Sequence, residues 1–155
     1  MASSDPLIRS DSLALVTVMC HNIPDAVRFY VGTLDFNLKC DEEINGERLV
    51  VATPPNLVEF TPTASLRFRE AKTEKDKRAV GNQAGDGVFL QIETDCWGKV
   101  YEKLKTMGTK ILDKEPRKGH QYQAVTVLDT LGNKVTIVEK TTTTLGTVFT
   151  KDVGH

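Results

Sequence analysis

The sequence is poor in the residues that usually bind metal ions or form cross-links. Its 155 residues include three histidines, one of them the last residue, His155, and three cysteines. Cys20, Cys40 and Cys96 are odd in number, widely spaced and without a CxxC pair, so they indicate neither a disulfide framework nor a structural zinc site. This cysteine usage is typical of a reducing compartment, and we expect a cytoplasmic protein.

The chain also lacks an excess of charge of either sign and any long hydrophobic run. Twenty lysines and arginines stand against 21 aspartates and glutamates, so no strong field attracts nucleic acid or an anionic membrane surface. No stretch of about 18 apolar residues occurs, and no apolar segment follows basic residues near the N-terminus. We therefore expect no nucleic-acid partner and no membrane association.

What the chain does have is the composition of a folded domain and one repeated order of elements. Hydrophobic residues make up 39% and charged residues 26%, close to the averages of globular proteins. In the first half, the apolar and turn patterns predict a strand, a helix and three strands, at residues 13–20, 22–36, 36–40, 47–53 and 65–69. In the second half the same order returns, at residues 88–94, 95–107, 109–112, 123–128 and 134–139.

The repeat predicts an α+β fold. A βαβββ unit leaves a sheet face uncovered and needs a partner unit, so we expect two modules, residues about 13–70 and 86–140, to build one curved mixed sheet with a concave ligand pocket. The charged stretch 71–85 is predicted to be a linker or mobile loop. Residues 141–155 break both helical and strand periodicity and are interpreted as a C-terminal tail, which leaves residues 1–140 as a single domain.

Short motifs in both halves carry a family resemblance. Residues 25–30 (DAVRFY), 34–36 (LDF) and 45–48 (NGER), then 104–108 (LKTMG) and 129–133 (DTLGN), occur in the order found in vicinal oxygen chelate proteins. The chain resembles that superfamily, which includes glyoxalase I, extradiol dioxygenases and bleomycin resistance proteins, over residues 13–140. The resemblance implies a half-barrel, glyoxalase-like domain. Two positions depart from its motifs: Asp35 replaces the glycine of LGF, and Thr130 replaces the proline of DPxGN.

The resemblance also implies where a metal ion would bind. Metal-using members place His, Gln or Glu near the start of the first strand of each half and a carboxylate on the last strand, and the motif spacing assigns these positions to Leu15, Phe89 and Thr136. Leu and Phe have no donor atom, and a neutral Thr hydroxyl is a weak ligand. A shift of one residue brings no stronger donor, since it gives Ala14, Val16, Val88, Leu90, Val135 or Ile137. We therefore expect no metal ion and no other cofactor.

Strand alternation and the resemblance together predict the lining of the pocket. If Leu15 and Phe89 point inward, alternate residues of the same strands share the concave face. Arg48 is expected to hold a carboxylate or phenolate, with a surface ion pair as the equal alternative. The predicted substrate-binding residues are Arg48, Leu15, Thr17, Met19, Phe89, Gln91, Tyr122 and Thr136.

Two residues are candidates for proton transfer. Glu93 would act as a general acid or base if burial beside Phe89 raises its pKa, and the alternative is a solvated carboxylate at the end of the strand. His120 lies just before the seventh strand and has a suitable ordinary pKa, and the alternative is an exposed loop histidine.

These residues predict a metal-independent, glyoxalase-like enzyme with isomerase, cyclase or lyase chemistry on an aromatic or polyketide-like small molecule. One alternative is a non-catalytic drug or metabolite binding protein of the bleomycin-resistance type. A second is a divalent-metal-dependent glyoxalase or dioxygenase whose donors lie elsewhere. Because relatives with two βαβββ units usually dimerise, the resemblance also implies a homodimer.

Overall fold

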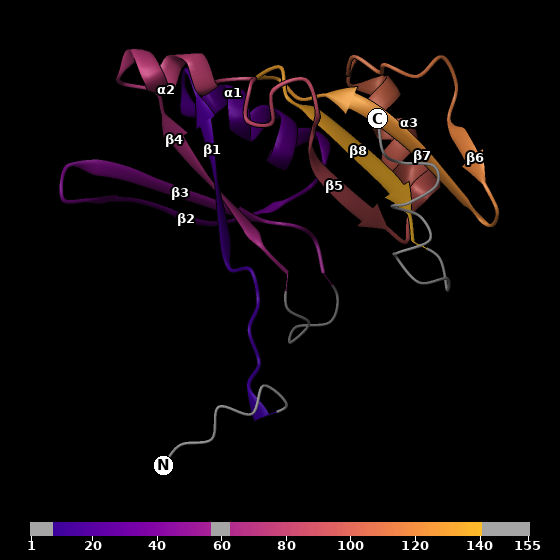
Figure 1. Ribbon diagram of the computed structural model, residues 1–155, viewed down its shortest axis with the longest axis horizontal. Helices are drawn as coiled ribbons and strands as arrows, with labels where there is room; N and C mark the ends of the chain where they lie inside the picture. The colour runs from indigo at the N-terminus through magenta and orange to yellow at the C-terminus, as the bar shows by residue number, and fades with distance from the viewer. Residues whose placement is uncertain (1–7, 57–62, 141–155) are drawn as a thin grey trace.

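The computed structural model describes residues 8–56 and 63–140, and these contain the predicted repeat (Figure 1). Its helices are α1 (Ile23–Val27), the π-helix η2 (Arg28–Thr33), α2 (Glu74–Ala79) and α3 (Trp97–Thr106). Its strands are β1 (Leu15–Cys20), β2 (Asn37–Ile44), β3 (Glu47–Thr53), β4 (Ser65–Glu70), β5 (Val88–Thr94), β6 (Arg117–Gly119), β7 (Tyr122–Leu128) and β8 (Lys134–Glu139). The predicted tail, residues 141–155, lies outside the described residues. No helix in the described ranges is long and apolar enough to cross a membrane.

The strands form two four-stranded mixed sheets, which confirms the predicted α+β class. The N-terminal sheet has the order β1-β4-β3-β2, and the C-terminal sheet has the equivalent order β5-β8-β7-β6. In each, the first and last strands of the module pair in parallel and the other pairs are antiparallel. The sheets lie side by side in Figure 1, with the β2–β3 hairpin projecting away from the C-terminal sheet.

One hydrophobic core joins both sheets to the helices. Val18 and Phe68 from the N-terminal sheet belong to the same buried cluster as Ile137 from the C-terminal sheet. Phe29 of η2 and Leu104 of α3 belong to it as well. Because strand side chains alternate between faces, this core contains the side chains of one face of each sheet. The side chains of the other face lie outside it.

A buried hydrogen-bond network also links the two modules. The Tyr30 hydroxyl of η2 donates to Oδ2 of Asp129, at 2.7 Å, in the turn before β8. The other oxygen of Asp129 accepts from the backbone N–H groups of Leu131 and Asn133, each at 2.8 Å. Burial, and then the charge of Asp129, raise the pKa of Tyr30 well above its ordinary value, so the hydroxyl keeps the proton that it donates.

Both departures from the superfamily motifs lie at contacts between the modules. Asp35 adopts a φ of 60°, the left-handed conformation in which glycine is common, and its carboxylate pairs with Lys103 of α3. Thr130 donates its hydroxyl hydrogen to the backbone carbonyl of Asp25 in α1. Each replacement therefore adds a polar contact that the glycine or proline could not make.

The predicted linker contains a helix, α2, that the sequence patterns did not indicate. Thr73 and Asp76 form a capping box: the Thr73 side chain accepts from the Asp76 N–H, and the Asp76 carboxylate accepts from the Thr73 N–H. None of the residues 74–79 is buried, so the segment has no hydrophobic period to reveal a helix.

After α2, Gln83 attaches the linker to the edge of β1 that does not pair with β4. Its side-chain Oε1 accepts from the Met19 N–H at 2.8 Å, and its Nε2 lies 3.5 Å from the Thr17 carbonyl. Its backbone N–H donates to Asn133 at 3.2 Å. The Met19 N–H and the Thr17 carbonyl lie on either side of Val18. They are the two groups that one residue of a parallel neighbouring strand would bind, and the Gln83 side-chain amide takes that place.

The first strand after α3 is shifted from its predicted place. Residues 109–112 hold one isolated bridge, at Ile111, and the paired strand is β6, Arg117–Gly119. The reason is a side chain: Asp113 accepts from the backbone N–H of Thr126 at 2.6 Å, where a strand residue would otherwise bind.

Candidate functional site

Each sheet has a far face, which is turned away from α1, η2 and α3. It consists of the strand residues that alternate with the core residues. The N-terminal far face carries Leu15, Thr17, Met19, Leu49, Val51, Arg67 and Arg69. The C-terminal far face carries Gln91, Glu93, Arg117, Tyr122, Ala124, Thr126, Thr136 and Val138.

A row of polar side chains crosses the C-terminal far face. Gln91, Thr136 and Thr126 are direct partners across β5, β8 and β7. The two threonine hydroxyls are 2.9 Å apart, and Nη2 of Arg117 donates to Thr126 Oγ1 at 3.2 Å. Thr136 is completely buried and Thr126 is nearly so. Their hydroxyls are therefore held inside the sheet and are not free surface groups.

Asp113 fixes Arg117 at the end of this row. Nη1 of Arg117 lies 2.7 Å from each carboxylate oxygen of Asp113, and both side chains are only 19% exposed. One of these oxygens also accepts from the Thr126 N–H. The guanidinium is therefore held in one orientation over the sheet, because its partner is itself tied to β7.

Three buried N–H groups on the far faces have no hydrogen-bond partner among the described residues. They belong to Nε2 of Gln91, Nε of Arg117 and Nε of Arg67. A buried polar group without a partner costs about 1–3 kcal/mol, and such groups in folded proteins usually have a reason. All three are donors, so a ligand that supplies oxygen acceptors would satisfy them.

The apolar side chains beside this row form their own small cluster, composed of Tyr122, Ala124 and Val138. The ring of Tyr122 lies over Gly119 of β6, where an added Cβ would come within 2.0 Å of the ring. The C-terminal far face therefore combines a packed apolar area with a polar row, as small-molecule sites commonly do.

Most of the residues predicted from the sequence lie on the far faces. Thr136, Met19 and Tyr122 are buried there, and the others are partly or largely exposed. The N-terminal far face has Leu15, Thr17 and Met19, and the C-terminal far face has Gln91, Glu93, Tyr122 and Thr136. Their roles in binding or catalysis stay predictions.

The structure does not bring the other three predicted residues to these faces. Phe89 lies at an irregularity in the β5–β8 register and packs against the main core. Arg48 lies on the opposite side of β3 and pairs with Asp41 at 2.9 Å, which lowers the pKa of the Asp41 carboxyl. His120 is exposed in the turn between β6 and β7.

The sequence pattern gave little or no indication that two arginines, Arg117 and Arg67, belong to the site. Arg117 follows Pro116 within a charged stretch that has no strand period, so nothing marked it as a residue of the site. Arg67 alternates with core residues of β4, but the same pattern is typical of any arginine on a solvated sheet face.

The side chains at the centre of the far faces do not fit the metal site of metal-using relatives. Thr17 and Arg67 are partners on β1 and β4, and Gln91 and Thr136 are their counterparts on β5 and β8. A guanidinium repels a divalent cation and a neutral threonine hydroxyl binds one weakly, which leaves Gln91 as the one family-type ligand among these four side chains. Within the described ranges, no three His, Cys, Asp or Glu side chains gather as possible ligands.

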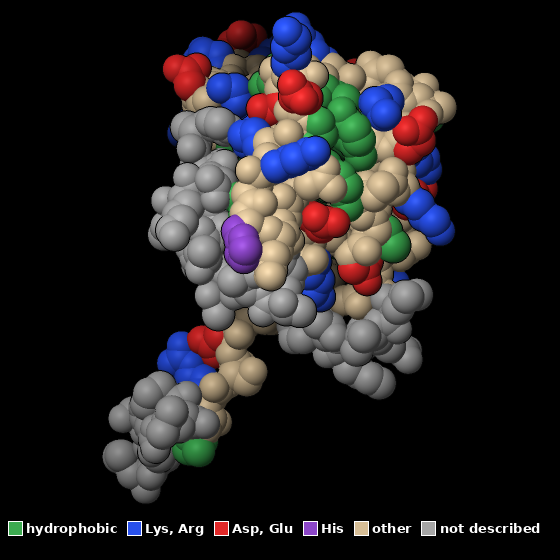
Figure 2. All heavy atoms as spheres, turned by 90° about the vertical axis from the view of Figure 1, so that its right-hand side faces the viewer, with side chains coloured by type: hydrophobic (Ala, Val, Ile, Leu, Met, Phe, Trp, Pro, Cys, Tyr) green, Lys and Arg blue, Asp and Glu red, His purple; other side chains and the backbone are tan. Residues whose placement is uncertain are grey.

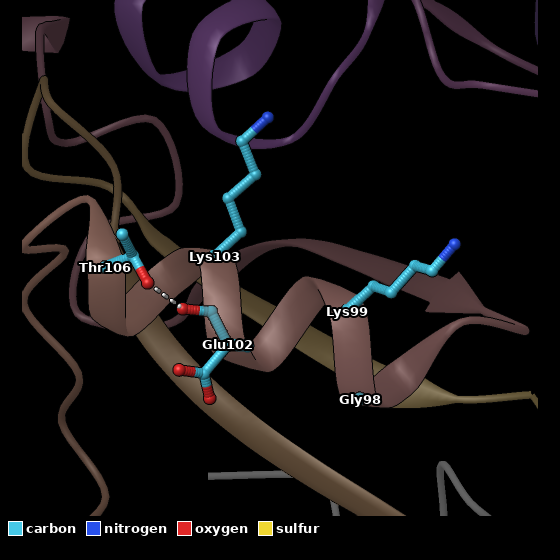
Figure 3. Close-up of a pocket in the computed structure, with 5 residues that line it drawn as sticks. All are labelled: Gly98, Lys99, Glu102, Lys103 and Thr106. Carbon is cyan, nitrogen blue, oxygen red and sulfur yellow. Dashed lines mark hydrogen bonds between the residues drawn. The ribbon is translucent and has the colours of Figure 1, made fainter.

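One hollow of the outer surface is less suited to a ligand. It measures about 500 Å³, lies along α3 and is lined by Gly98, Lys99, Glu102, Lys103 and Thr106. Figure 3 shows that these residues come from a single helix and that the two lysines point away from it, so no groups converge on one point. Figure 2 shows basic and acidic side chains interleaved around a band of hydrophobic ones on the side of the molecule that lies at the right in Figure 1.

Comparisons with known proteins agree with this architecture. A family model described as "Glyoxalase/Bleomycin resistance protein/Dioxygenase superfamily" matches residues 12–137. An uncharacterized protein of Shewanella frigidimarina is 29% identical over 122 residues, which cover 77% of this chain and 86% of that protein.

Two solved structures show the same fold at low sequence identity. The crystal structure of UcmS2 is 19% identical, with a TM-score of 0.68 and coverage of 84% of this chain and 98% of that one. TnmS3, described as an antibiotic binding protein from Streptomyces sp. CB03234, is 18% identical, with a TM-score of 0.65 and coverage of 86% and 99%.

Proposed function

The chain belongs to the glyoxalase/bleomycin resistance protein/dioxygenase superfamily, and we propose that within it this protein binds a small organic molecule on the far faces without transforming it. The fold does not choose among activities, because one fold can host unrelated functions. The choice therefore rests on the side chains of the site.

The unpaired donors of the polar row are the observation that supports this proposal most directly. Nε2 of Gln91 and Nε of Arg117 are buried without hydrogen-bond partners in the described part of the chain, while Thr126 and Thr136 of the same row are hydrogen-bonded. A ligand oxygen that accepts from them offsets the cost of burying these donors without a hydrogen bond. The neighbouring apolar cluster suits an aromatic or polyketide-like body that carries carbonyl or phenol oxygens.

A structural neighbour supports a binding role. TnmS3 is described as an antibiotic binding protein, and its structure aligns with 86% of this chain. Sequestration needs a complementary surface and no catalytic group, and the polar row with its neighbouring apolar cluster supplies such a surface.

The enzymatic alternative, metal-independent proton transfer by His120 and Glu93, finds less support. Glu93 lies on β5 and His120 follows β6, and these strands are the two edges of the C-terminal sheet. Three strand spacings of about 4.8 Å separate the edges, whereas an acid and a base must both reach the reacting atoms of one substrate. Turnover of a bound compound that disappears in Glu93→Gln or His120→Ala would favour the enzyme.

Replacement of Gln91 by leucine tests the binding proposal. Wild-type protein is screened by thermal shift against aromatic and polyketide antibiotics, since a ligand at 100 times its Kd stabilises by about 2.7 kcal/mol. Gln91→Leu should weaken the Kd of a hit about tenfold, the effect of losing roughly 1.4 kcal/mol, without loss of stability in the absence of ligand.

Gln123→Leu is the matched control. Gln123 lies on the same sheet, in β7, but on the opposite face, so this variant should bind the hit like the wild type. Equal affinity of all three proteins, or the lack of any hit, would contradict the proposal.

We also expect two copies of the chain to associate. Leu15 on one edge strand of the N-terminal sheet and Leu38 and Ile44 on the other are each 47% exposed, and association of two copies would take such side chains out of water. Light scattering should give about twice 17.2 kDa, and a monomer across the concentration range would refute this expectation.

A further inference from the structure

Arg67 occupies the centre of the N-terminal far face. It lies in the middle of β4, between its partners Thr17 on β1 and Val51 on β3. Its side chain is 27% exposed, yet its Nε is buried and has no hydrogen-bond partner among the described residues. The Nε–H of the Arg67 guanidinium is therefore a buried donor on this face that makes no hydrogen bond within the described residues.

The charge of Arg67 is only partly balanced. Its Nη2 lies 3.3 Å from Oε1 of Glu47, and the same oxygen accepts from Nε of Arg69 at 2.9 Å. One carboxylate oxygen thus serves two guanidiniums and is closer to Arg69. The next carboxylate on this face, Glu42, lies one strand further out on the edge strand β2 and is exposed.

The surroundings of Arg67 would strengthen its interaction with an anion. Val51, the partner of Arg67 on β3, is half-buried, and Met19, the β1 partner of the neighbouring Arg69, is buried, so apolar side chains lie on this face around the guanidinium. In such surroundings a charge-assisted hydrogen bond is stronger than in water. A carboxylate can accept two parallel hydrogen bonds from one guanidinium edge, a geometry that arginine provides and lysine does not.

We propose that Arg67 is an anion-binding residue, and that the ligand of this protein carries a carboxylate or phenolate that accepts from its Nε edge. The inference rests on the proposed binding function and adds the chemical class of the ligand. It also explains the poor fit of a metal ion, because a fixed positive side chain stands at the centre of this face. A merely structural Arg67, paired with Glu47 on a wet sheet face, would show no preference for anions.

Matched pairs of probes separate the two roles of Arg67. The binding of benzoate, 2-naphthoate and anthraquinone-2-carboxylate is compared with that of the corresponding carboxamides by calorimetry. Wild-type protein should bind at least one carboxylate tenfold or more tightly than its amide. Arg67→Gln should remove this preference and leave the affinity for the amide within twofold.

Arg78→Gln is the control for net charge. Arg78 lies on the exposed helix α2, so this variant loses the same charge and should keep the preference for the carboxylate. A second measurement needs no variant: raising NaCl from about 50 to 500 mM should weaken binding of the carboxylate and leave binding of the amide unchanged, because salt screens a charge pair.

The outcomes distinguish this inference from the proposed function. Equal binding of carboxylate and amide by the wild type overturns the role of Arg67 and leaves the binding function in place. A preference that survives in Arg67→Gln overturns it as well. If none of the six probes binds, both the inference and the function on which it rests are overturned.

Discussion

Removal of the Tyr30 hydroxyl should destabilise the protein because it breaks the buried link between the modules. In Tyr30→Phe the ring, which packs against Phe29, Phe36 and Phe68, stays in place. What is lost is the 2.7 Å hydrogen bond to the buried carboxylate of Asp129. A hydrogen bond to a charged group contributes about 1.5–3 kcal/mol, so we expect a loss of about 2 kcal/mol.

The loss can be followed by thermal and denaturant unfolding. For a chain of this length, 1 kcal/mol corresponds to roughly 2–4 °C in Tm, so Tyr30→Phe should lower the Tm by about 4–8 °C. Tyr101→Phe is the control. Its ring stacks on Trp97, its hydroxyl has no hydrogen bond within the described part of the chain, and its stability should stay within about 0.5 kcal/mol of the wild type.

The same residue predicts a dependence on alkaline pH. The pKa of Tyr30 is raised above 10 in the folded protein by burial and by Asp129, while an unfolded tyrosine titrates near 10. The stability that this proton provides is therefore complete below about pH 10 and is lost as the pH rises above it, since only the unfolded chain then releases the proton. The stability gap between wild type and Tyr30→Phe should narrow from pH 9 to pH 11. A constant gap, or a variant as stable as the wild type, would refute the reasoning.

Two further substitutions test the C-terminal sheet. Gly119→Ala should cost about 1–3 kcal/mol in urea unfolding, because its Cβ would lie 2.0 Å from the Tyr122 ring, whereas Gly98→Ala meets no atom within 4 Å and should stabilise α3 by about 0.5–1 kcal/mol. Equal effects would contradict this packing. Asp113→Asn should cost about 3 kcal/mol, because it leaves the guanidinium of Arg117 without its carboxylate in a site that is only 19% exposed. A loss below about 0.5 kcal/mol would show that the pair does not hold the polar row.

Local chemistry explains which parts of the fold could be predicted from the sequence. Asn45 and Gly46 both adopt positive φ angles in the β2–β3 turn, as an Asn-Gly hairpin requires. The strands at 47–53, 88–94 and 134–139 agree with the structure residue for residue, because β-branched runs and flanking turn residues mark them. Helix α2 was missed because it is stabilised by its caps and buries no hydrophobic face.

The sheet face of a site residue could be predicted from the sequence only where the alternation within its own strand is clear. Alternation along β5 agrees with the structure at Gln91 but not at Phe89, where the β5–β8 register shifts. Residues 49–52 of β3 are apolar at every position, so the pattern could not tell which face Arg48 joins. The place of Arg117 depends on the pairing of β6 with β7 and on the side chain of Asp113. Such long-range register is not visible in a local pattern.

The amide of Gln83 also covers part of a strand edge that pairs with no other strand in the described residues. In the described residues β1 pairs with β4 alone, and an unpaired strand edge is a template on which another chain can add a strand and start aggregation. Gln83 already accepts from the Met19 N–H and lies against the Thr17 carbonyl. Another strand could therefore not form hydrogen bonds with these two groups in the middle of the edge. A residue of a short connecting loop thus reduces the number of free backbone groups that this edge offers to another strand.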